Sequence, residues 1–266
     1  MAWLGVALAL IAFFIWQNND IILSNVNWTH RKVPPPFDGF KILLVSDLHG
    51  KRFGRGQRRL LNKAAACRPD IIAIVGDIVD GRRKKTEGAL EFVAQAAGIA
   101  PVYFVTGNHE WQYGRYEAFK EQLVAAGAAV LDNAYVTLQK GEARIRLAGV
   151  KDLAFGSKSA YKKSLRKLAQ SLEMTILLTH RPEKIALYAA NGFDLVLAGH
   201  AHGGQVRLPF IGGLYAPGQG VFPRYTSGLH NVKETSMVIS RGLGNSLFPL
   251  RVFNRPELVL VTLHAG

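Results

Sequence analysis

The sequence predicts an α/β fold in which a largely parallel sheet is flanked by helices and preceded by one N-terminal hydrophobic helix. From residue 41 onward, short apolar runs rich in Ile, Val and Leu alternate with helical stretches, and this alternation is typical of βαβ units. The first sixteen residues differ from the rest, because residues 2–16 contain no charged or strongly polar side chain. With 266 residues, the chain has the length of one large domain and can bury a sizeable core.

Residues 1–23 are interpreted as an N-terminal membrane anchor. About 20 apolar residues usually span a bilayer, so the stretch is slightly short, and Asp20 is unfavourable in hydrocarbon. Trp3 and Trp16 flank it, as suits the membrane interface. A signal peptide and a buried helix are the alternatives, but there is no basic start and no clear cleavage site. Lys and Arg follow the segment and none precedes it, which predicts a single pass through the cell membrane with the globular part in the cytoplasm.

Residues 24–40 are expected to form a linker that contains the stiff run Pro34-Pro35-Pro36, and residues 41–266 are expected to form the globular domain. Short apolar runs bounded by turn residues predict buried strands at residues 42–46, 71–75, 102–106, 176–179 and 195–198. The stretches between them predict helices at residues 57–68, 86–97, 116–126, 161–171 and 182–190. Beyond Gly199 the chain becomes Gly-rich and predicts short strands at residues 205–208, 237–240 and 258–263.

The composition is strongly basic, with 33 Lys plus Arg against 19 Asp plus Glu and a formal net charge of +14. Such an excess attracts polyanions, including nucleic acid and anionic lipid headgroups, but it does not determine the fold. The basic residues gather at residues 51–59, 82–85 and 158–167, where a solvated surface explains them about as well as an anion-binding role does. The single cysteine, Cys67, permits no intramolecular disulfide and is expected to be a small buried residue.

Each of the five predicted buried strands ends in side chains that can bind a metal ion. Ligands bind at the carboxyl ends of strands in open α/β sheets, so neighbouring strands would bring these ends together. In chain order, the ends carry Asp47 and His49, then Asp77 and Asp80, then Asn108, His109 and Glu110, then His180, and finally His200 and His202.

These residue types suit a pair of divalent metal ions. Imidazole and carboxylate ligands favour Mn, Fe, Zn or Ni, and cysteine is absent from the set. Asp47 and His49 are two residues apart and can point at one ion, and His200 and His202 repeat that spacing. A single shared carboxylate, Asp77, can bridge two ions about 3.5–4 Å apart, and such a pair activates water for an in-line displacement at phosphorus.

A single histidine at a strand end is more often a hydrogen-bonded polar residue than a metal ligand. Here, however, five of the eight histidines lie at successive strand ends, each beside Asp, Asn or Gly, so coincidence does not account for the pattern. The other three, His30, His230 and His264, lack such surroundings and are not expected to be ligands.

In chain order these residues form the patterns D-x-H, GDxxD, GNHE, H and GHxH, and the series resembles the calcineurin-like metallophosphoesterases. The similarity extends over residues 37–263. Residues 37–41, 199–209, 240–244 and 254–257 are also similar to a membrane-anchored bacterial subgroup that includes the YkuE and YaeI proteins.

The resemblance implies a four-layer α-β-β-α sandwich of the metallophosphoesterase type, with two divalent ions, Mn being favoured. It implies that His109 faces the substrate and helps the leaving oxygen to depart, a role that suits histidine as a proton donor. Asp80 and Glu110 are expected to orient the histidine ligands through hydrogen bonds. The implied ligands are Asp47, His49, Asp77 and His202 for the first metal, and Asp77, Asn108, His180 and His200 for the second.

The implied activity is hydrolysis of a phosphodiester, phosphomonoester or pyrophosphate bond. An anchor and a basic site rim favour a membrane-associated, lipid-linked substrate, and the resemblance makes UDP-2,3-diacylglucosamine one candidate. The alternatives are a nuclease or soluble-nucleotide phosphodiesterase, and a non-catalytic metal-stabilised binding module. Nucleic acid is disfavoured because no aromatic-basic platform is evident, and the complete set of ligands argues against lost catalysis. The oligomeric state is left open.

Overall fold

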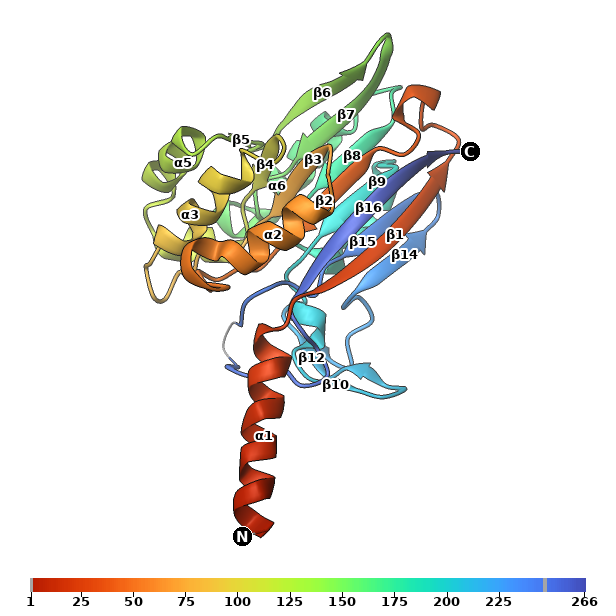
Figure 1. The fold of residues 1–266 in the computed structure, drawn as a ribbon. Helices are drawn as coiled ribbons and strands as arrows, with labels where there is room; N and C mark the ends of the chain where they lie inside the picture. The colour runs from red at the N-terminus through yellow and green to blue at the C-terminus, as the bar shows by residue number, and fades with distance from the viewer. Residues whose placement is uncertain (1, 246–247) are drawn as a thin grey trace.

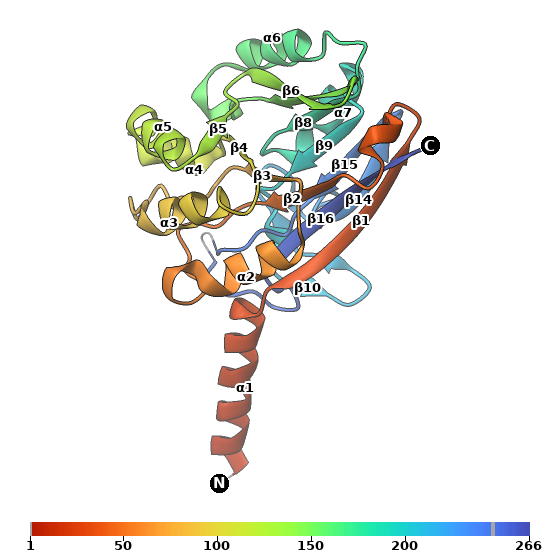
Figure 2. The ribbon, with the colours of Figure 1, turned by 45° about the horizontal axis from the view of Figure 1, so that its top comes forward.

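The computed structural model describes residues 2–245 and 248–266, and it confirms the expected α/β sandwich. Two six-stranded mixed sheets pack against each other, and helices cover their outer faces (Figures 1 and 2). The result is four layers, which is the arrangement that the family resemblance implied.

The first sheet has the strand order β1-β16-β2-β3-β4-β5. Its central strands are short apolar runs that are covered on both faces, which explains why they lack a polar alternation. β2 to β5 run parallel to one another, whereas β16 is antiparallel to β2. The strands are β1 (Ile22–His30), β2 (Lys41–Val45), β3 (Ile71–Val75), β4 (Val102–Val105), β5 (Ala128–Val130) and β16 (Glu257–Ala265).

The second sheet has the order β14-β15-β9-β8-β7-β6. Its parallel centre consists of β15, β9, β8 and β7, and an antiparallel strand closes each edge. The expected strands at residues 176–179, 195–198 and 237–240 are therefore present within one or two residues. The strands are β6 (Ala134–Lys140), β7 (Ala143–Gly149), β8 (Thr175–Leu178), β9 (Leu195–Ala198), β14 (Gly228–Val232) and β15 (Thr235–Ile239).

Three apolar cores hold the layers together. The central core lies between the sheets and includes Leu44, Val75 and Leu197, all fully buried. One outer core joins the first sheet to α2, α3 and α5, and the other joins the second sheet to α6 and α7. The helices are α2 (Arg58–Ala66), α3 (Glu87–Ala96), α4 (Asn108–Tyr113), α5 (Tyr116–Ala125), α6 (Lys158–Leu168) and α7 (Ile185–Ala190), with 3-10 turns at Pro35–Phe37, Arg55–Gln57, Leu153–Phe155, Pro182–Lys184 and His202–Gly204.

The N-terminal helix α1 (Ala2–Asn19) projects from the sandwich, and only its C-terminal end is embedded in it (Figure 1). Gln17 and Asn18 are buried there, whereas most of the apolar residues before them are exposed. The expected hydrophobic helix is thus present. Across residues 2–245 and 248–266, however, no helix is both long and apolar enough to cross a membrane, so the expected single-pass span is not found.

Residues 22–30, most of which were expected to belong to the linker, instead form β1 at the edge of the first sheet. β1 runs parallel to β16, with Ile22 opposite Glu257 and His30 opposite Ala265. Polar and apolar side chains alternate along it, as expected for an edge strand with one solvated face.

Two small hairpins lie on the side of the sandwich from which α1 projects (Figures 1 and 2). They follow the expected change to Gly-rich sequence, and the strand expected at residues 205–208 is shortened to its last two residues. The first pairs β10 (Arg207–Leu208) with β11 (Gly212–Gly213), and the second pairs β12 (Tyr215–Ala216) with β13 (Gly220–Val221).

Candidate metal centre

The five strands that carry the candidate ligands are divided between the two sheets. β2, β3 and β4 belong to the first sheet, and β8 and β9 belong to the second. The expectation that neighbouring strands of one sheet bring the loops together was therefore incomplete. The site lies where the carboxyl ends of both sets of strands face each other across the sandwich.

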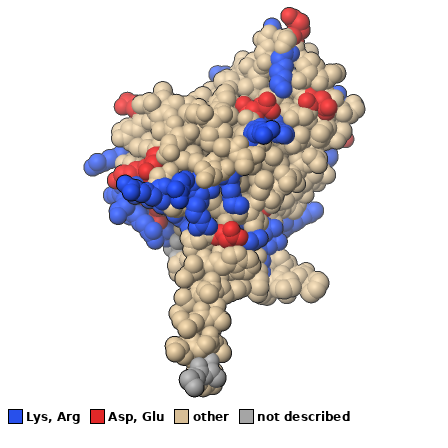
Figure 3. Space-filling model, in the orientation of Figure 1, with Lys and Arg blue, Asp and Glu red and all other residues tan. Residues whose placement is uncertain are grey.

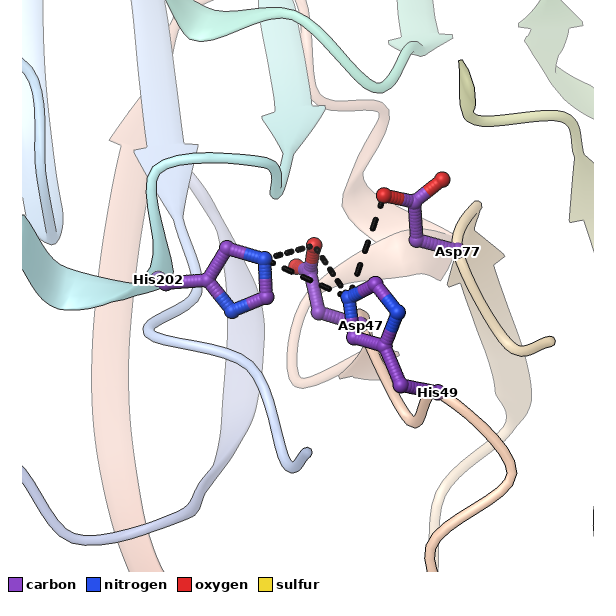
Figure 4. A group of neighbouring side chains, drawn as sticks. All are labelled: Asp47, His49, Asp77 and His202. Atoms are coloured by element: carbon purple, nitrogen blue, oxygen red, sulfur yellow. Dashed lines mark hydrogen bonds and ion pairs between the residues drawn. The ribbon is translucent and has the colours of Figure 1, made fainter. Parts of the chain in front are cut away.

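The first group of candidate ligands contains Asp47, His49, Asp77 and His202, all of them buried (Figure 4). The His202 Nε2 lies 3.3 Å from the Asp47 Oδ1 and 3.3 Å from the His49 Nε2. The His49 Nε2 is 3.9 Å from the Asp47 Oδ1 and 3.9 Å from the Asp77 Oδ2. One ligand atom from each residue therefore points toward a common centre.

The second group contains Asp77, His180 and His200, so Asp77 belongs to both groups. The His180 Nε2 is 3.1 Å from the Asp77 Oδ2 and 3.0 Å from the His200 Nδ1. The opposite nitrogen of His180 donates a hydrogen bond to the Val75 carbonyl, 2.7 Å away, which turns Nε2 toward the carboxylate. Asn108 lines the same pocket as Asp77, and its side-chain oxygen is buried without a hydrogen-bond partner.

Each of the two carboxylates has one oxygen held by the protein and one directed into the cluster. The Asp47 Oδ2 accepts hydrogen bonds from the Ser46 hydroxyl and the His200 backbone N–H, while its Oδ1 is buried without a partner. The Asp77 Oδ1 accepts the His109 backbone N–H at 2.7 Å, and its Oδ2 faces the imidazoles. Buried unpaired acceptors that converge on one point fit a cation.

The protonation states of most of the candidate ligands also fit metal binding. Burial lowers the pKa of His49, His200 and His202, so these imidazoles are neutral. Burial opposes ionisation of Asp77, but the surrounding histidines, His180 foremost, hold its pKa well below the usual range. Burial also lowers the pKa of His180, yet Asp77 and Asp47 outweigh it and raise the value to about 10. His180 therefore carries a proton at neutral pH that a bound metal would displace, whereas the other three imidazoles and the Asp77 carboxylate are already in the forms that bind metal.

The backbone at the site adopts an uncommon conformation. Non-glycine residues seldom have positive φ, because the Cβ then approaches the carbonyl oxygen. Here this left-handed conformation occurs at Asp47, His49, Asp77, His200 and His202, with φ between 48° and 67°. Gly76 also has positive φ, and a Cβ there would strike the Gly107 backbone. The loops are thus held in the geometry that turns the ligand side chains inward.

Glu110 fixes two of these loops in a way that the sequence analysis did not foresee. Its carboxylate accepts backbone N–H groups from Gly107 at 2.6 Å, Asp77 at 2.8 Å and Ile78 at 3.0 Å. Burial and the Asp77 charge raise the pKa of Glu110 to about 8, against the effect of these donors. Glu110 was expected to orient a histidine side chain. Instead it orients the backbone of the loops that follow β3 and β4.

His109 lies beside the cluster, at the edge of a pocket. Its Nδ1 accepts the Gly81 backbone N–H at 3.2 Å, which places the ring proton on Nε2, 4.0 Å from the Asp77 Oδ2. Asp80, which was expected to orient a histidine, lies 3.5 Å from the same Nδ1 and accepts hydrogen bonds from Arg82. The pocket is lined by Asp77, Arg82, Asn108, His109, Gln112, His200, His202 and Pro217.

The remaining three histidines lie outside both groups of candidate ligands. His30 stacks on Trp28, His230 bonds to the Ser227 carbonyl, and His264 pairs with Asp38. Arg82, Gln112 and Pro217 line the pocket but were not singled out as site residues. Arg82 belongs to the basic cluster at residues 82–85, and that cluster was the one signal that pointed to it.

Residues 40–204 match the calcineurin-like phosphoesterase family, and the chain therefore belongs to that family. It is 31% identical over 238 residues to the uncharacterized metallophosphoesterase YkuE of Bacillus subtilis, which covers 87% of this chain and 81% of YkuE. It is 32% identical over 231 residues to the phosphodiesterase YaeI of Escherichia coli, which covers 84% of this chain and 82% of YaeI. The suspected relationship to these bacterial proteins is confirmed.

A solved structure, a dimetal phosphatase from Danio rerio, superposes with a TM-score of 0.50 at 12% identity and covers 77% of this chain and 88% of that one. That likeness concerns the fold alone. The family, the two groups of converging ligands and the relatives together identify the chain as a metal-dependent phosphoester hydrolase of a family that uses two divalent metals.

Proposed function

We propose that this protein hydrolyses a phosphate ester with two divalent metal ions that share Asp77. The observation that supports this most strongly is that one buried carboxylate belongs to both groups of converging ligands. Two bound ions lower the pKa of a water molecule and neutralise the charge on the phosphate oxygens. In this proposal the first ion is held by Asp47, His49, Asp77 and His202, and the second by Asp77, Asn108, His180 and His200. Carboxylate and imidazole ligands suit Mn, Fe, Zn or Ni, and of these we propose manganese.

In this proposal His109 donates the proton that the leaving oxygen needs. Its Nδ1 is occupied by the Gly81 N–H, so its proton sits on Nε2, on the side of the ring that faces Asp77. A donor at this position stabilises the negative charge that develops on the leaving oxygen. The adjoining loop holds the ring because Gly81 and Asp80 lie against the same nitrogen.

Arg82 is proposed to bind a non-bridging oxygen of the substrate phosphate. It lines the pocket, and its side chain is 41% exposed, so it can reach a ligand. The Arg82 Nε donates a hydrogen bond to the Asp80 Oδ1 at 3.1 Å, which limits the motion of the guanidinium. Other N–H groups of the guanidinium remain available for a ligand. A cation at the pocket mouth favours an anionic ester.

A phosphodiester is the proposed bond, and the name of the Escherichia coli relative, a phosphodiesterase, supports it. A substrate held at the cell membrane remains our proposal, with the catalytic domain on the cytoplasmic side. A lipid-linked diphosphate such as UDP-2,3-diacylglucosamine is one member of that class, and no feature of the pocket singles it out. A nuclease remains the second candidate because of the net charge of +14.

The test is a hydrolysis screen with Mn, Fe, Zn and Ni on bis-p-nitrophenyl phosphate, p-nitrophenyl phosphate and labelled DNA. We expect the diester to be cleaved, chelator to abolish cleavage, and DNA to remain intact. DNA cleavage would favour the nuclease, and no turnover with any metal would leave only a binding module.

Asp77→Asn tests the shared carboxylate within the same screen. Asparagine keeps the side-chain shape and tolerates the left-handed backbone at this position, where φ is 53°. Because the bridging charge is lost, bound metal should fall from two ions to one or none, and activity by about a thousandfold or more. Metal content is counted by inductively coupled plasma mass spectrometry. Two ions and wild-type turnover would contradict the shared role of Asp77.

A further inference from the structure

The end of the molecule from which α1 projects exposes an unusual number of large apolar side chains. Monomeric soluble proteins seldom expose contiguous apolar patches of more than a few hundred Å². Here Phe210 is fully exposed at the turn between β10 and β11, and Phe222, just after β13, is 65% exposed. We define the apolar tip as the exposed apolar residues of α1 together with Phe210, Ile211, Val221, Phe222 and Phe253.

The parts of the apolar tip belong to one continuous end of the fold. Phe253 packs edge-on against Phe13 of α1, with ring centroids 5.6 Å apart. The first hairpin is joined to the same C-terminal segment, since Gln205 donates hydrogen bonds to the Phe248 and Leu250 carbonyls. Figure 1 shows both hairpins beside the end of α1 that enters the domain.

Basic side chains contact the end of α1 where it enters the domain. Lys51 and Arg59 donate hydrogen bonds to the Asn18 and Asn19 carbonyls at the end of the helix. Arg255 lies over the Trp16 ring, 4.9 Å from its centroid. Figure 3 shows Lys and Arg gathered on the domain directly above α1, and the exposed arginines of residues 51–59 are Arg52, Arg55, Arg58 and Arg59.

This combination fits a lipid surface. Aromatic and aliphatic side chains enter the boundary between headgroups and acyl chains, while cations above them meet anionic headgroups. The strength of such binding rises with the apolar area that is buried and with electrostatic attraction to anionic lipids. A protein partner or a second copy of the chain would not by itself require basic residues gathered next to an apolar projection.

The pocket at the metal centre opens beside the second of these hairpins. Pro217, in the turn between β12 and β13, lines the pocket together with His200 and His202. Val221 and Phe222 lie at the end of that hairpin and are exposed. A molecule whose apolar tail rests in the lipid can thus bring its phosphate to the pocket along the hairpin.

We propose that the apolar tip rests in the interfacial region of a bilayer that contains anionic lipid, and that the pocket takes phosphate esters with an apolar tail from that surface. The contact requires no membrane-spanning segment. The proposed substrate rests on the proposed hydrolase activity, whereas the proposed lipid contact does not.

Lipid contact by the hairpins is tested with the full chain in a Cys67→Ala background that carries Phe210→Cys or Phe222→Cys with an environment-sensitive nitrobenzoxadiazole label. Leu172→Cys is the matched control, because Leu172 is fully exposed in the turn between α6 and β8. With vesicles of phosphatidylcholine and phosphatidylglycerol, emission at 210 and 222 should shift to the blue, whereas emission at 172 should not.

Two results would overturn the contact. The protein could co-float with vesicles while the emission of the labels at 210 and 222 stays unchanged. This result would mean that α1 alone binds lipid. A blue shift that appears without vesicles as the protein concentration rises would mean that a second copy covers the tip.

The charge requirement is tested with Arg55→Glu combined with Arg59→Glu. Affinity for phosphatidylglycerol-containing vesicles should fall by about tenfold or more, with little change on pure phosphatidylcholine. Lys162→Glu combined with Lys163→Glu, two exposed positions on α6, is the control and should leave affinity unchanged. Equal loss in both double variants would show a general charge effect and sink the idea of a specific cationic surface.

The substrate half is tested with hexadecyl p-nitrophenyl phosphate in those vesicles, against soluble bis-p-nitrophenyl phosphate. Phe210→Ser combined with Phe222→Ser should slow the vesicle-bound ester about tenfold or more and leave the soluble one unchanged. If the soluble ester is cleaved but the double variant cleaves both at wild-type rates, the lipid route is wrong. If neither ester is cleaved by the wild type, the hydrolase assignment itself fails, while vesicle binding still decides the contact.

Discussion

At the scale of single residues, the candidate site combines ligand chemistry with an uncommon backbone. Five of the candidate ligands have positive φ, although none of them is glycine. Residues in this conformation usually cost of order 1–3 kcal/mol each and persist where the surrounding structure enforces them. These conformations occur together in the pairs Asp47/His49 and His200/His202 and in the shared Asp77. This indicates that the geometry of the metal site is kept at a cost in local stability.

A comparison of two substitutions at His202 measures this strain. With φ at 48°, alanine keeps the unfavourable Cβ whereas glycine does not, so His202→Gly should be more stable than His202→Ala by about 1 kcal/mol. At His180, which is not among the residues with positive φ, the order should reverse by about 0.5–1 kcal/mol. Urea unfolding of metal-free protein gives both differences. If alanine were the more stable residue at His202 as well as at His180, the left-handed backbone at His202 would carry no measurable strain.

His109→Ala separates chemistry from metal binding. The side chain borders the pocket without belonging to either ligand group, so both ions should remain bound. Loss of the proton donor should lower kcat by about 10²–10⁴-fold, with a smaller effect for esters whose leaving group is p-nitrophenolate, which departs without a proton. Metal counts and kcat for an alkyl and an aryl ester are the measurements. A loss of metal would reassign His109 to a structural role.

The sequence predicted which side chains meet at the site better than it predicted what holds them. Asp47, His49, Asp77, His180 and their partners are recognisable because their chemistry is rare at strand ends. The hydrogen bonds of Glu110 and the proton position on His109 depend on backbone N–H groups that face them, and no residue pattern specifies those directions.

At the scale of elements, the segment between β15 and β16 supports the metal loops. Arg251 is fully buried and donates hydrogen bonds to the carbonyls of Arg241, Gly244 and Asn254. The Gly244 N–H in turn binds the Asp47 carbonyl, and the Asn254 side chain donates to the His202 carbonyl at 2.7 Å. Burial lowers the pKa of Arg251 to about 10, which still leaves it charged at neutral pH.

Arg251→Met should therefore lower the free energy of unfolding by about 2–4 kcal/mol, because several buried carbonyls lose their donor. Metal affinity should fall as well, since the Asp47 and His202 loops lose support. Arg224→Met, at an exposed position, is the control and should change neither quantity. Unfolding in urea and metal titration provide the readouts, and a variant as stable as the control would rule out the supporting role.

The predictability of an element depended on its burial. Strands covered on both faces, such as β3 and β9, have uninterrupted apolar sequences and were located within one residue. β1 and the β6–β7 hairpin have solvated faces and mixed polarity, so their sequences resemble linkers and loops. Pairing with distant partners, rather than local propensity, makes them strands.

At the scale of the whole molecule, the proposed metals connect the two sheets. Asp47 and Asp77 follow strands of the first sheet, whereas His180, His200 and His202 follow strands of the second. The sequence alone indicated a parallel α/β arrangement. Its division into two facing sheets came from the family resemblance, because apolar runs do not reveal which strands are neighbours.

Metal removal should therefore destabilise the entire sandwich. An ion that binds only the folded state adds about 4 kcal/mol when it is present at a thousand times its Kd. At roughly 2–4 °C per kcal/mol for a domain of this size, chelation should lower Tm by about 8 °C or more. Calorimetry with and without EDTA makes the comparison, and Asp77→Asn should show a much smaller dependence. Equal Tm values for the wild type in both buffers would mean that the ions do not join the sheets.

The pairing of β1 with β16 imposes an order of events during synthesis. Residues 22–30 leave the ribosome before their partner, residues 257–265, which is translated on the order of ten seconds or more afterwards. Until then β1, an edge strand whose partner in the sheet is β16, has no strand to pair with. The sheet that carries Asp47 and Asp77 is completed only when β16 enters between β1 and β2. Hydrolysis therefore begins only after α1 has been synthesised and has had time to contact other molecules.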